Sequence, residues 1–565
     1  MRSDPDKTID KGVLVHILFA GGVLIGFAAV MAWQPILADE WDFYRAAADW
    51  AHDRALIPHP QAYVHLLQAS LALFGKTPGS ARIPGILTAL LNLALIPMIV
   101  KAFWGDTPTS RRIAIAAVWL YALAPLTPQN MMLVDIDNTL LTTVLLSFIW
   151  LWKRTQDWPS PKRITALSIA LAAALWTKLP TPVVLIGSLG LFYLLRWDLR
   201  RLIELALITA GGGLLFVVSF ALYGQLTGFT FAFFGPAFGN LSSTGDFRGL
   251  LPRVPQTMGV FVLWLSLPVT ALLTLVLFQT VGRVFNRQLE DRDFLVIYVA
   301  AMMAFYAVIM VPAWGYPRYH APAVPVIAVL VAALLLPVSE GLPRKVWLLA
   351  AALGIAYVVY ALVVIGDPLW DLYTLTFETD LGDLPQRLRE GMTLIAQLSF
   401  PLVIGMAIGL FFLVARWRLL LRPAGIYLLG ILAAASMLST LVVQIPADYS
   451  TRYRYTYRYD DLFQAIDTVK AVGGTTLAIK DVLYDAGVPG EEIYPYVCPA
   501  CLPQGLLDKL RGEQIDTLVW TTKEDNRSPA VTQSPEVRET LDRCYRRVDH
   551  GVFITYRRTS EGPCE

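Results

Sequence analysis

The chain has 565 residues, of which 56% are hydrophobic and only 16% charged, and its formal net charge is +2. A soluble chain of this size would carry about a quarter charged residues, so this composition excludes an ordinary soluble enzyme. The nearly balanced charge gives no reason to expect a nucleic-acid partner. Many runs reach the roughly 20 apolar residues that cross a bilayer. The sequence therefore predicts a polytopic α-helical membrane protein.

Thirteen apolar runs are predicted as transmembrane helices. The first run is too long for the core of a signal peptide and has no A-x-A-like cleavage site near its end, so it is expected to remain as a helix. The predicted spans cover residues 12–33, 82–103, 112–127, 138–152, 164–178, 182–195, 202–224, 257–281, 293–312, 321–338, 346–365, 396–415 and 424–444.

Basic residues support this count because they gather in alternate loops. Loops such as "KRTQDWPSPKR", "RWDLRR" and "ARWRLLLR" are typical of the cytoplasmic side. The alternation predicts a cytoplasmic N-terminus and a tail outside the membrane. The opposite loops, which are long or acidic, are expected to face the non-cytoplasmic side together with the tail: 34–81, 128–137, 225–256, 313–320 and 366–395.

The first outer loop, 34–81, begins with an acidic group. Asp39, Glu40 and Asp42 stand where the first helix should leave the bilayer. Two amphipathic patterns, at 39–54 and 61–74, predict helices that lie in the membrane interface. A solvated helix end would explain these acids if they stood alone.

A second acidic group lies at the outer end of the third span. In "MMLVDIDNTL", Asp135 and Asp137 sit among apolar residues. A charge at membrane depth costs roughly 2.5–3.5 kcal/mol on insertion scales, so such residues usually mark function. A helix cap by Asp137 or Asn138 is the alternative, and it explains one carboxylate but not two.

Two basic groups stand on the same predicted face. Lys178 lies in "WTKLPTP", and Arg318 is followed by Tyr319 and His320 in "WGYPRYHAPAVP". Snorkelling to the interface would explain either cation alone, although the positive-inside rule disfavours both here. Two acidic and two basic groups on one face are what a site for an anionic lipid-linked substrate and a hydroxyl acceptor would need.

The tail from residue 446 changes character. "TTLAIK" and "DTLVW" predict short strands, and "DDLFQAIDTVKAV" and "SPEVRETLDRCY" predict amphipathic helices, so a small α/β domain is expected at 446–565 after a membrane domain at 1–445. Cysteines confined to an extracytoplasmic domain suggest disulfides, with the connectivity left open. "CPAC" as half of a zinc site is the alternative. The four cysteines of the chain are Cys498, Cys501, Cys544 and Cys564.

Five stretches follow one another between residues 12 and 340: "DEWDFY", "HPQAYVHLLQASLALFGKTPGSARIPG", "MMLVDIDNTL", "LWTKLPTPVVL" and "YPRYHAPAVPVIAVL". In this order they resemble the motifs of the GT-C glycosyltransferases of the protein O-mannosyltransferase and lipid A aminoarabinose transferase type. Gln61 stands where a second proline is usual, and Leu179 where glycine is common. The resemblance implies a GT-C fold with about 13 transmembrane helices, interfacial helices in the first outer loop and an extracytoplasmic C-terminal domain.

The resemblance also implies a polyprenyl-phosphate sugar as donor and an inverting displacement. Asp39 would then be the base for the acceptor hydroxyl. Glu40 would position the acceptor or hold an interfacial helix. Asp135 or Asp137 would support the acceptor site or the base. Tyr44 belongs to the first motif and is expected to bind substrate.

The cations of the later motifs have the complementary role. Lys178 and Arg318, with Tyr319 and His59, would hold the donor phosphate, and His320 belongs to the same binding group. The paired acids of the second motif could supply ligands to a divalent metal. Enzymes of this type do not generally need one, so no cofactor is predicted.

Two other functions compete with this one. A polymerase or ligase acting on lipid-diphosphate oligosaccharides would use a similar face. A transporter is less favoured, because it should show paired repeats and broken helices at mid-membrane depth. The acceptor, whether lipid, glycan or protein, is left open. The expected location is a bacterial inner membrane, among membrane lipids, with the C-terminal domain in the periplasm.

Overall fold

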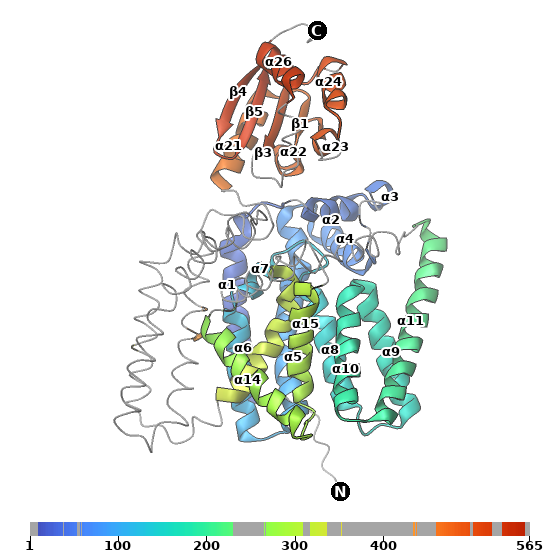
Figure 1. Ribbon diagram of the computed structural model, residues 1–565. Helices are drawn as coiled ribbons and strands as arrows, with labels where there is room; N and C mark the ends of the chain where they lie inside the picture. Colours follow the sequence, from blue (N-terminus) through green and yellow to red (C-terminus); the bar gives the residue numbers. More distant parts are fainter. Residues whose placement is uncertain are drawn as a thin grey trace. The chain divides into compact units, whose positions relative to one another are not determined.

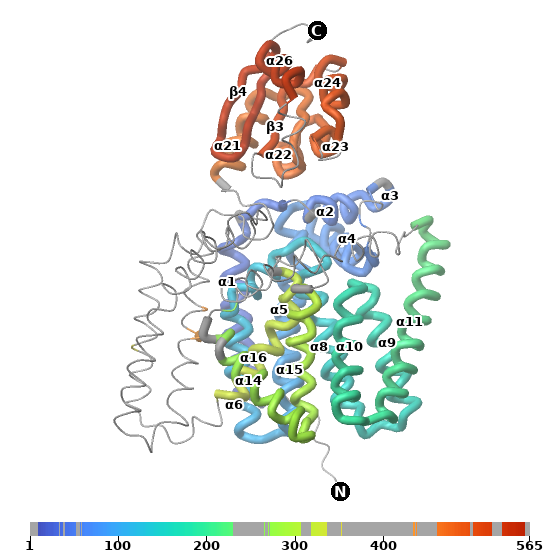
Figure 2. Tube along the Cα trace, viewed as in Figure 1, coloured from blue at the N-terminus to red at the C-terminus, as the bar shows by residue number. Residues whose placement is uncertain are grey.

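A computed structural model gives the fold of the chain (Figures 1 and 2). It describes residues 10–229, 265–308, 317–335, 459–497, 501–512, 514–521 and 534–559, with gaps at 38, 54–56, 58 and 266, and a few isolated positions elsewhere. The chain divides into two compact units. The first comprises residues 1–32 and 46–446, and the second comprises residues 33–45 and 447–565.

The first unit is helical. Ten of the predicted spans coincide with described helices, while those at 346–365, 396–415 and 424–444 lie outside the described ranges. Among the described helices, α1, α5, α11 and the segment Arg318–Leu335 are long and apolar enough to cross a membrane unaided. The helices are α1 (Lys11–Val30), α3 (Trp50–Asp53), α4 (Ala62–Phe74), α5 (Pro78–Trp104), α6 (Pro108–Leu123), α7 (Leu126–Met131), α8 (Thr139–Arg154), α9 (Ser160–Thr177), α10 (Pro180–Leu195), α11 (Leu199–Thr227), α14 (Leu267–Phe285), α15 (Asp293–Val308), the 3₁₀ helix η5 (Pro317–Ala323) and α16 (Val324–Leu335).

Local signals in the sequence fix several helix starts. Thr107 and Ser110 form a reciprocal capping box before α6, with Pro108 at the first helical position. Asn138 caps α8, its side-chain oxygen accepting from the Leu140 N–H at 2.8 Å. Asp198 caps α11 in the same way. These caps satisfy N–H groups that the first turn of a helix leaves without partners.

A close approach between α5 and the chain around Met131 positions the segment before α8. A Cβ at Gly85 would lie 2.2 Å from the Met131 carbonyl oxygen, so only glycine fits there. Next to it, Thr139 Oγ1 donates to the Gly85 carbonyl at 2.5 Å and contacts Thr88 Oγ1 at 2.7 Å. Asn92 extends this buried polar contact with α8. The loop between α7 and α8 is thereby held against α5.

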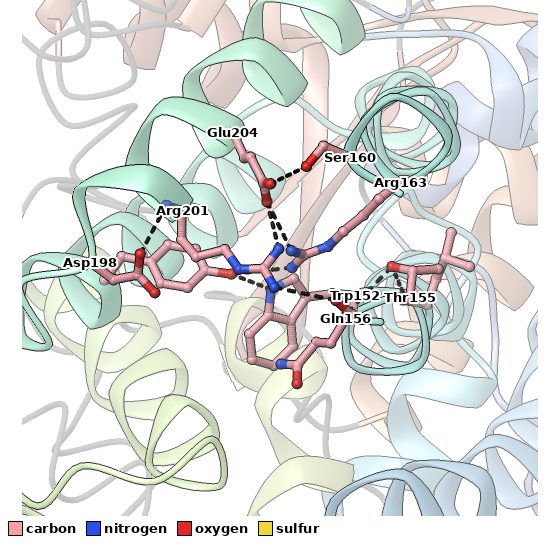
Figure 3. A network of polar contacts seen from close by, with 10 residues as sticks. Trp152, Thr155, Gln156, Ser160, Arg163, Asp198, Arg201 and Glu204 are labelled. Carbon is pink, nitrogen blue, oxygen red and sulfur yellow. Dashed lines mark hydrogen bonds and ion pairs between the residues drawn. The ribbon is translucent and has the colours of Figure 1, made fainter. Parts of the chain in front are cut away.

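Helices α9, α10 and α11 pack beside one another in Figure 2, and a buried ion cluster joins two of them. Glu204 on α11 accepts from Ser160 at 2.6 Å, from Arg163 at 2.9 Å and from Arg201 at 2.6 Å (Figure 3). Arg163 is 2% exposed and Glu204 6%. A buried charge is tolerated only when paired in this way. The sequence analysis does not predict this cluster.

The first outer loop forms helices, as predicted. The 39–54 pattern becomes α2 (Asp39–Ala48) and α3, and the 61–74 pattern becomes α4. Helix α2 is the place where the chain passes from the second unit to the first, since the two units meet in sequence between Arg45 and Ala46.

The second unit contains the small α/β domain expected from the tail. Its sheet has the order β2-β1-β3-β5-β4, parallel across β2, β1 and β3 and antiparallel from β3 through β5 to β4. Gly551 adopts a positive φ of 59° in the tight β4–β5 turn, a conformation that favours glycine. The elements are α21 (Tyr459–Val472), β1 (Thr476–Ala478), α22 (Lys480–Ala486), β2 (Gly490–Glu492), α23 (Tyr494–Val497), α24 (Pro503–Gly512), β3 (Thr517–Thr521), α26 (Pro535–Cys544), β4 (Tyr545–His550) and β5 (Phe553–Arg558).

Two cysteines of this domain are described by the structure. Cys501 and Cys544 are both disulfide-bonded, and the described residues include no free cysteine. Cys498 and Cys564 lie outside the described ranges. The predicted disulfide chemistry is confirmed for the two described cysteines, whose sulfurs are then not zinc ligands.

Candidate active site

Four predicted charged residues meet in two buried ion pairs within the first unit. Lys178 Nζ donates to Asp137 Oδ1, and Arg318 Nη1 lies 2.8 Å from Asp135 Oδ2. The four side chains are 4–7% exposed. They come from three places in the chain: the loop before α8, the C-terminal end of α9, and η5. The sequence places the same four residues on one predicted face, and the structure brings them together as pairs.

One aromatic ring, that of Tyr319, contacts both cations. The Tyr319 ring centroid is 4.3 Å from Lys178 Nζ and 5.3 Å from Arg318 Cζ, distances at which a ring face attracts a cation. Tyr306 on α15 stacks on Tyr319, with ring centroids 5.1 Å apart and an interplanar angle of 8°. The Tyr306 hydroxyl lies 2.7 Å from Thr181 Oγ1 on α10. Both cations therefore contact an aromatic pair, Tyr319 and Tyr306, that is itself bonded to α10 through Thr181.

Backbone contacts set the position of the two carboxylates. Asn130 Nδ2 on α7 donates to the Asp137 carbonyl at 2.8 Å. The Asn138 N–H donates to the Asp135 carbonyl at 3.2 Å, so the loop turns tightly just before α8. Because Asn138 is the cap of α8, capping accounts for neither carboxylate. Both acids are instead paired with cations.

The two cations and two carboxylates of this site have a net charge of zero, and the two cations are the groups that could bind an anion. Two positive and two negative groups that are almost fully buried are stable only as pairs. An entering phosphate would bring negative charge next to Lys178 and Arg318, both of which can form charge-assisted hydrogen bonds with it. Arginine can also bind two phosphate oxygens at once, whereas lysine acts as a point charge.

The two predicted histidines are placed differently. His320 is buried on η5, with its ring 5.7 Å from the Tyr306 ring in an edge-on arrangement. His59 is half-buried in the loop before α4, and its backbone carbonyl accepts from Gln61 Nε2 at 2.9 Å. Gln61, which replaces the usual proline, is fully buried and also binds the Ile57 carbonyl. His320 therefore lies with the aromatic support of the charged pairs, and His59 lies in the first outer loop.

The first acidic group belongs to the second unit. Asp39 is the first residue of α2. Glu40 is fully buried, and its Oε2 accepts from the Leu37 N–H at 2.9 Å. The solvated-end explanation therefore fails for Glu40, whose side chain instead fixes the start of the helix. Tyr44 is half-buried, and burial raises the pKa of its hydroxyl, which stays protonated and able to donate.

The sequence does not mark two residues that contact this site, Tyr306 and Thr181, or a third buried polar residue, Arg82. Tyr306 is hidden in an apolar span, where an aromatic residue is ordinary. Thr181 follows Lys178 in "TKLPTP" and could have been noticed there. Arg82 on α5 is 1% exposed and donates to the Ala32 carbonyl at 3.2 Å. A buried arginine within an apolar helix was the available signal for it.

Comparisons with known proteins bear on this arrangement. Residues 58–223 match a family described as dolichyl-phosphate-mannose-protein mannosyltransferase. The chain is similar to ArnT from Cupriavidus metallidurans bound to undecaprenyl phosphate, at 14% identity over 98% of this chain and 99% of that one, with a TM-score of 0.54. The chain is also similar to ArnT from the same organism in the apo state, at 15% identity over 96% of this chain and 97% of that one, with a TM-score of 0.54.

A third structure, the Archaeoglobus fulgidus oligosaccharyltransferase tethered with an acceptor peptide, is 10% identical over 97% of this chain and 74% of that one, with a TM-score of 0.48. No curated protein matches the sequence significantly. The likeness to ArnT gives the chain a GT-C-like fold. The family match covers the helices from α4 to α11, including Asp135, Asp137 and Lys178. The family match confirms the resemblance seen in the motifs over residues 58–223, and the fold that the resemblance implies agrees with the likeness to ArnT.

Proposed function

We propose that the chain transfers a sugar from a polyprenyl-phosphate donor to an acceptor at the non-cytoplasmic face of the membrane, with inversion of the anomeric centre. The observation that carries this proposal is the pair of buried cations, Lys178 and Arg318, fixed on Tyr319. The similar ArnT structure is bound to undecaprenyl phosphate, which supports the choice of a lipid monophosphate.

The two cations would stabilise the departing lipid phosphate. Negative charge on that phosphate grows as the sugar leaves, so fixed cations bind the transition state more strongly than the ground state. Asp135 and Asp137 pair with Arg318 and Lys178 and hold these cations in place before the donor arrives. We assign these acids as positioning residues for the phosphate-binding cations.

The acceptor hydroxyl needs a base, and we propose Asp39. The assignment rests on its place in the first motif, "DEWDFY", at the start of α2. Glu40 would keep that start ordered through its bond to Leu37, and Tyr44 would donate to the acceptor or donor sugar. Because a lipid phosphate is a good leaving group, no general acid is required.

The reaction is also proposed to proceed without a divalent metal. Two fixed cations can supply the positive charge that a bridging metal would otherwise provide. We further propose that the N-terminus is cytoplasmic, that the sheet domain faces the periplasm, and that the protein resides in a bacterial inner membrane.

A donor assay tests this function. Purified protein in lipid nanodiscs is given undecaprenyl-phosphate mannose, undecaprenyl-phosphate aminoarabinose or a lipid-diphosphate oligosaccharide, with and without EDTA. Transfer from a monophosphate donor, unaffected by EDTA, is expected. Transfer from the diphosphate donor alone would replace this proposal with the ligase function. Calorimetric binding of undecaprenyl phosphate measures the phosphate site independently of the sugar.

The base assignment has its own test. Asp39→Asn should lower the rate of transfer by roughly 10²–10⁴-fold, because an amide cannot take the acceptor's proton. Binding of undecaprenyl phosphate should be unchanged. Asp460→Asn, at an exposed position of α21, is the matched control. Activity of Asp39→Asn within about threefold of the wild type would reject the base.

A further inference from the structure

Side chains of helix α2 form ion pairs and hydrogen bonds with the small α/β domain. Lys480 Nζ, at the start of α22, lies 2.7 Å from Asp42 Oδ2 on α2. Arg45, three residues further along α2, donates to the Tyr484 hydroxyl and lies 3.3 Å from Glu492 Oε1 on β2. All of these residues belong to the second unit, which is formed by 33–45 and 447–565.

The two helices present matching faces. Asp42 and Arg45 are spaced i, i+3 on α2, while Lys480 and Tyr484 are spaced i, i+4 on α22, so each pair lies on one side of its helix. The charges alternate in the order needed: an acid meets a lysine, and an arginine meets a hydroxyl backed by Glu492. The chain thus pairs two short stretches almost 440 positions apart through side chains of opposite charge.

Tyr484 is the centre of this contact. Its hydroxyl donates to Glu492 Oε1 at 2.5 Å while accepting from Arg45. Its ring lies 5.4 Å from the Trp41 ring and 4.8 Å from Arg45 Cζ, which adds a cation–π contact. Burial, reinforced by Glu492, raises the pKa of Tyr484 and keeps the donating proton in place.

Helix α2, which makes these contacts, begins with Asp39. Asp42 lies one turn beyond Asp39, and Arg45 lies nearly two turns beyond it. A rigid helix transmits a displacement at Asp42 or Arg45 directly to its first residue. A misplacement of about 1 Å at a reacting group can cost on the order of 100-fold in rate.

We propose that Lys480, Tyr484 and Glu492 are positioning residues that hold α2 in its catalytic orientation, so that the α/β domain is part of the transferase machinery. The inference rests on the proposed function, in which Asp39 is the base. It gives the C-terminal domain a task that its sequence, which carries no recognisable motif, does not reveal.

A charge swap tests the proposal. Lys480→Asp places two carboxylates against each other and should lower kcat for sugar transfer roughly 10- to 100-fold with little change in the KM for donor. The double variant Asp42→Lys with Lys480→Asp restores opposite charges and should recover most of the rate. Tyr484→Phe keeps the ring but removes the hydroxyl bridge, and a smaller loss of kcat is expected.

Neighbouring residues provide the matched controls. Glu491 pairs with Lys509 at 2.9 Å within the α/β domain, while its neighbour Glu492 pairs with Arg45. Glu492→Gln should therefore lower kcat, whereas Glu491→Gln should leave it unchanged. Equal losses in both would mean that these changes act through the stability of the domain, and this would overturn the positioning role.

Hydrogen exchange of residues 39–48 separates failure of this inference from failure of the proposed function. Lys480→Asp should accelerate exchange in α2 by about tenfold or more relative to the wild type and Glu491→Gln, and the double swap should restore protection. Unchanged exchange in Lys480→Asp would overturn the inference, whatever the activity. A second outcome is that Lys480→Asp accelerates exchange but the protein transfers sugar from none of the polyprenyl-phosphate donors. That result would overturn the proposed transferase role, whereas the contact between α2 and the α/β domain would be supported.

Discussion

At the scale of residues, the charged pairs explain why costly groups persist in an apolar chain. Asp135 and Asp137 each form an ion pair with a cation from a distant segment, and the Tyr319 ring contacts both cations. Residue types and their predicted side of the membrane could be obtained from hydropathy and the alternation of basic loops. The pairing itself could not, because which acid meets which cation depends on the turn fixed by Asn130 and Asn138.

Arg318 provides the sharpest test at this scale. Arg318→Lys should weaken binding of undecaprenyl phosphate and lower transfer by roughly tenfold, since a point charge cannot reproduce two parallel bonds to phosphate. Arg318→Gln should be worse, but it also leaves the Asp135 carboxylate buried without its cation. The comparison variant is therefore Asp135→Asn with Arg318→Gln, which removes both charges.

The two variants distinguish two roles for the arginine. If Arg318 only neutralises Asp135, the double variant should bind the lipid phosphate almost as well as the wild type. If Arg318 holds the phosphate, the double variant should remain as weak as Arg318→Gln. Calorimetry with undecaprenyl phosphate measures this, and recovery in the double variant would refute phosphate binding by Arg318.

Glu204 gives a residue-scale prediction about stability. Glu204→Ala leaves Arg163 buried without its carboxylate and should destabilise the protein by about 3 kcal/mol, the lower end for breaking a buried pair. Thermal unfolding in detergent provides the measurement. Glu290→Ala is the control, because the Glu290–Arg292 pair is about half exposed and should contribute little. Similar unfolding temperatures for the two variants would show that the cluster does not stabilise the α9–α11 pair.

At the scale of elements, the site depends on how α5 and α8 meet. The predicted limits of the helices agree with the structure within a few residues where caps mark them, as at Thr107 and Asn138. Packing partners are a different matter, because hydropathy says that a helix crosses the membrane but not which helix it touches. The threonines and Asn92 that join α5 to α8 were present in the sequence, yet nothing there assigned them to one contact.

Gly85 is the test of that contact. Gly85→Ala puts a Cβ about 2.2 Å from the Met131 carbonyl oxygen, so the loop that carries Asp135 and Asp137 must move. We expect a loss of about 1–3 kcal/mol in stability, as for other overpacked sites, and reduced binding of undecaprenyl phosphate. Gly187→Ala on α10 is matched to it, since an added Cβ there meets no atom within 4 Å.

The two glycine variants should change the stability of the protein in opposite directions or, at least, by different amounts. A glycine inside a helix costs roughly 0.5–1 kcal/mol relative to alanine, so Gly187→Ala should leave stability unchanged or raise it slightly. Unfolding temperature and lipid-phosphate affinity are read for both. Wild-type values for Gly85→Ala would mean that α5 and the α7–α8 loop do not approach as closely as described.

At the scale of the whole molecule, the chain combines a helical unit with a small sheet domain, and the sequence indicated both from the change in hydropathy near residue 446. It did not indicate that residues 33–45 group with the tail. That grouping comes from side-chain pairs between Asp42, Arg45 and the α22–β2 region, and such long-range pairs leave no trace in composition or periodicity.

The topology is the last prediction, and it concerns the whole chain. If the sheet domain faces the oxidising side, its cysteines should be oxidised in the mature protein, as Cys501 and Cys544 are here. Alkylation before reduction should label few or no native thiols, and alkylation after reduction should label all four.

Two cysteine variants then determine which side of the membrane each segment faces: Lys470→Cys on α21 and Arg200→Cys on α11, both at exposed positions. A membrane-impermeant maleimide should label Lys470→Cys in sealed spheroplasts and Arg200→Cys only after permeabilisation, because "RWDLRR" follows the positive-inside rule. Labelling in the reverse order would place the tail in the cytoplasm. The outer loops that carry the acids and cations would then face the cytoplasm too, and the proposed site for a lipid-linked donor would lie on the wrong face.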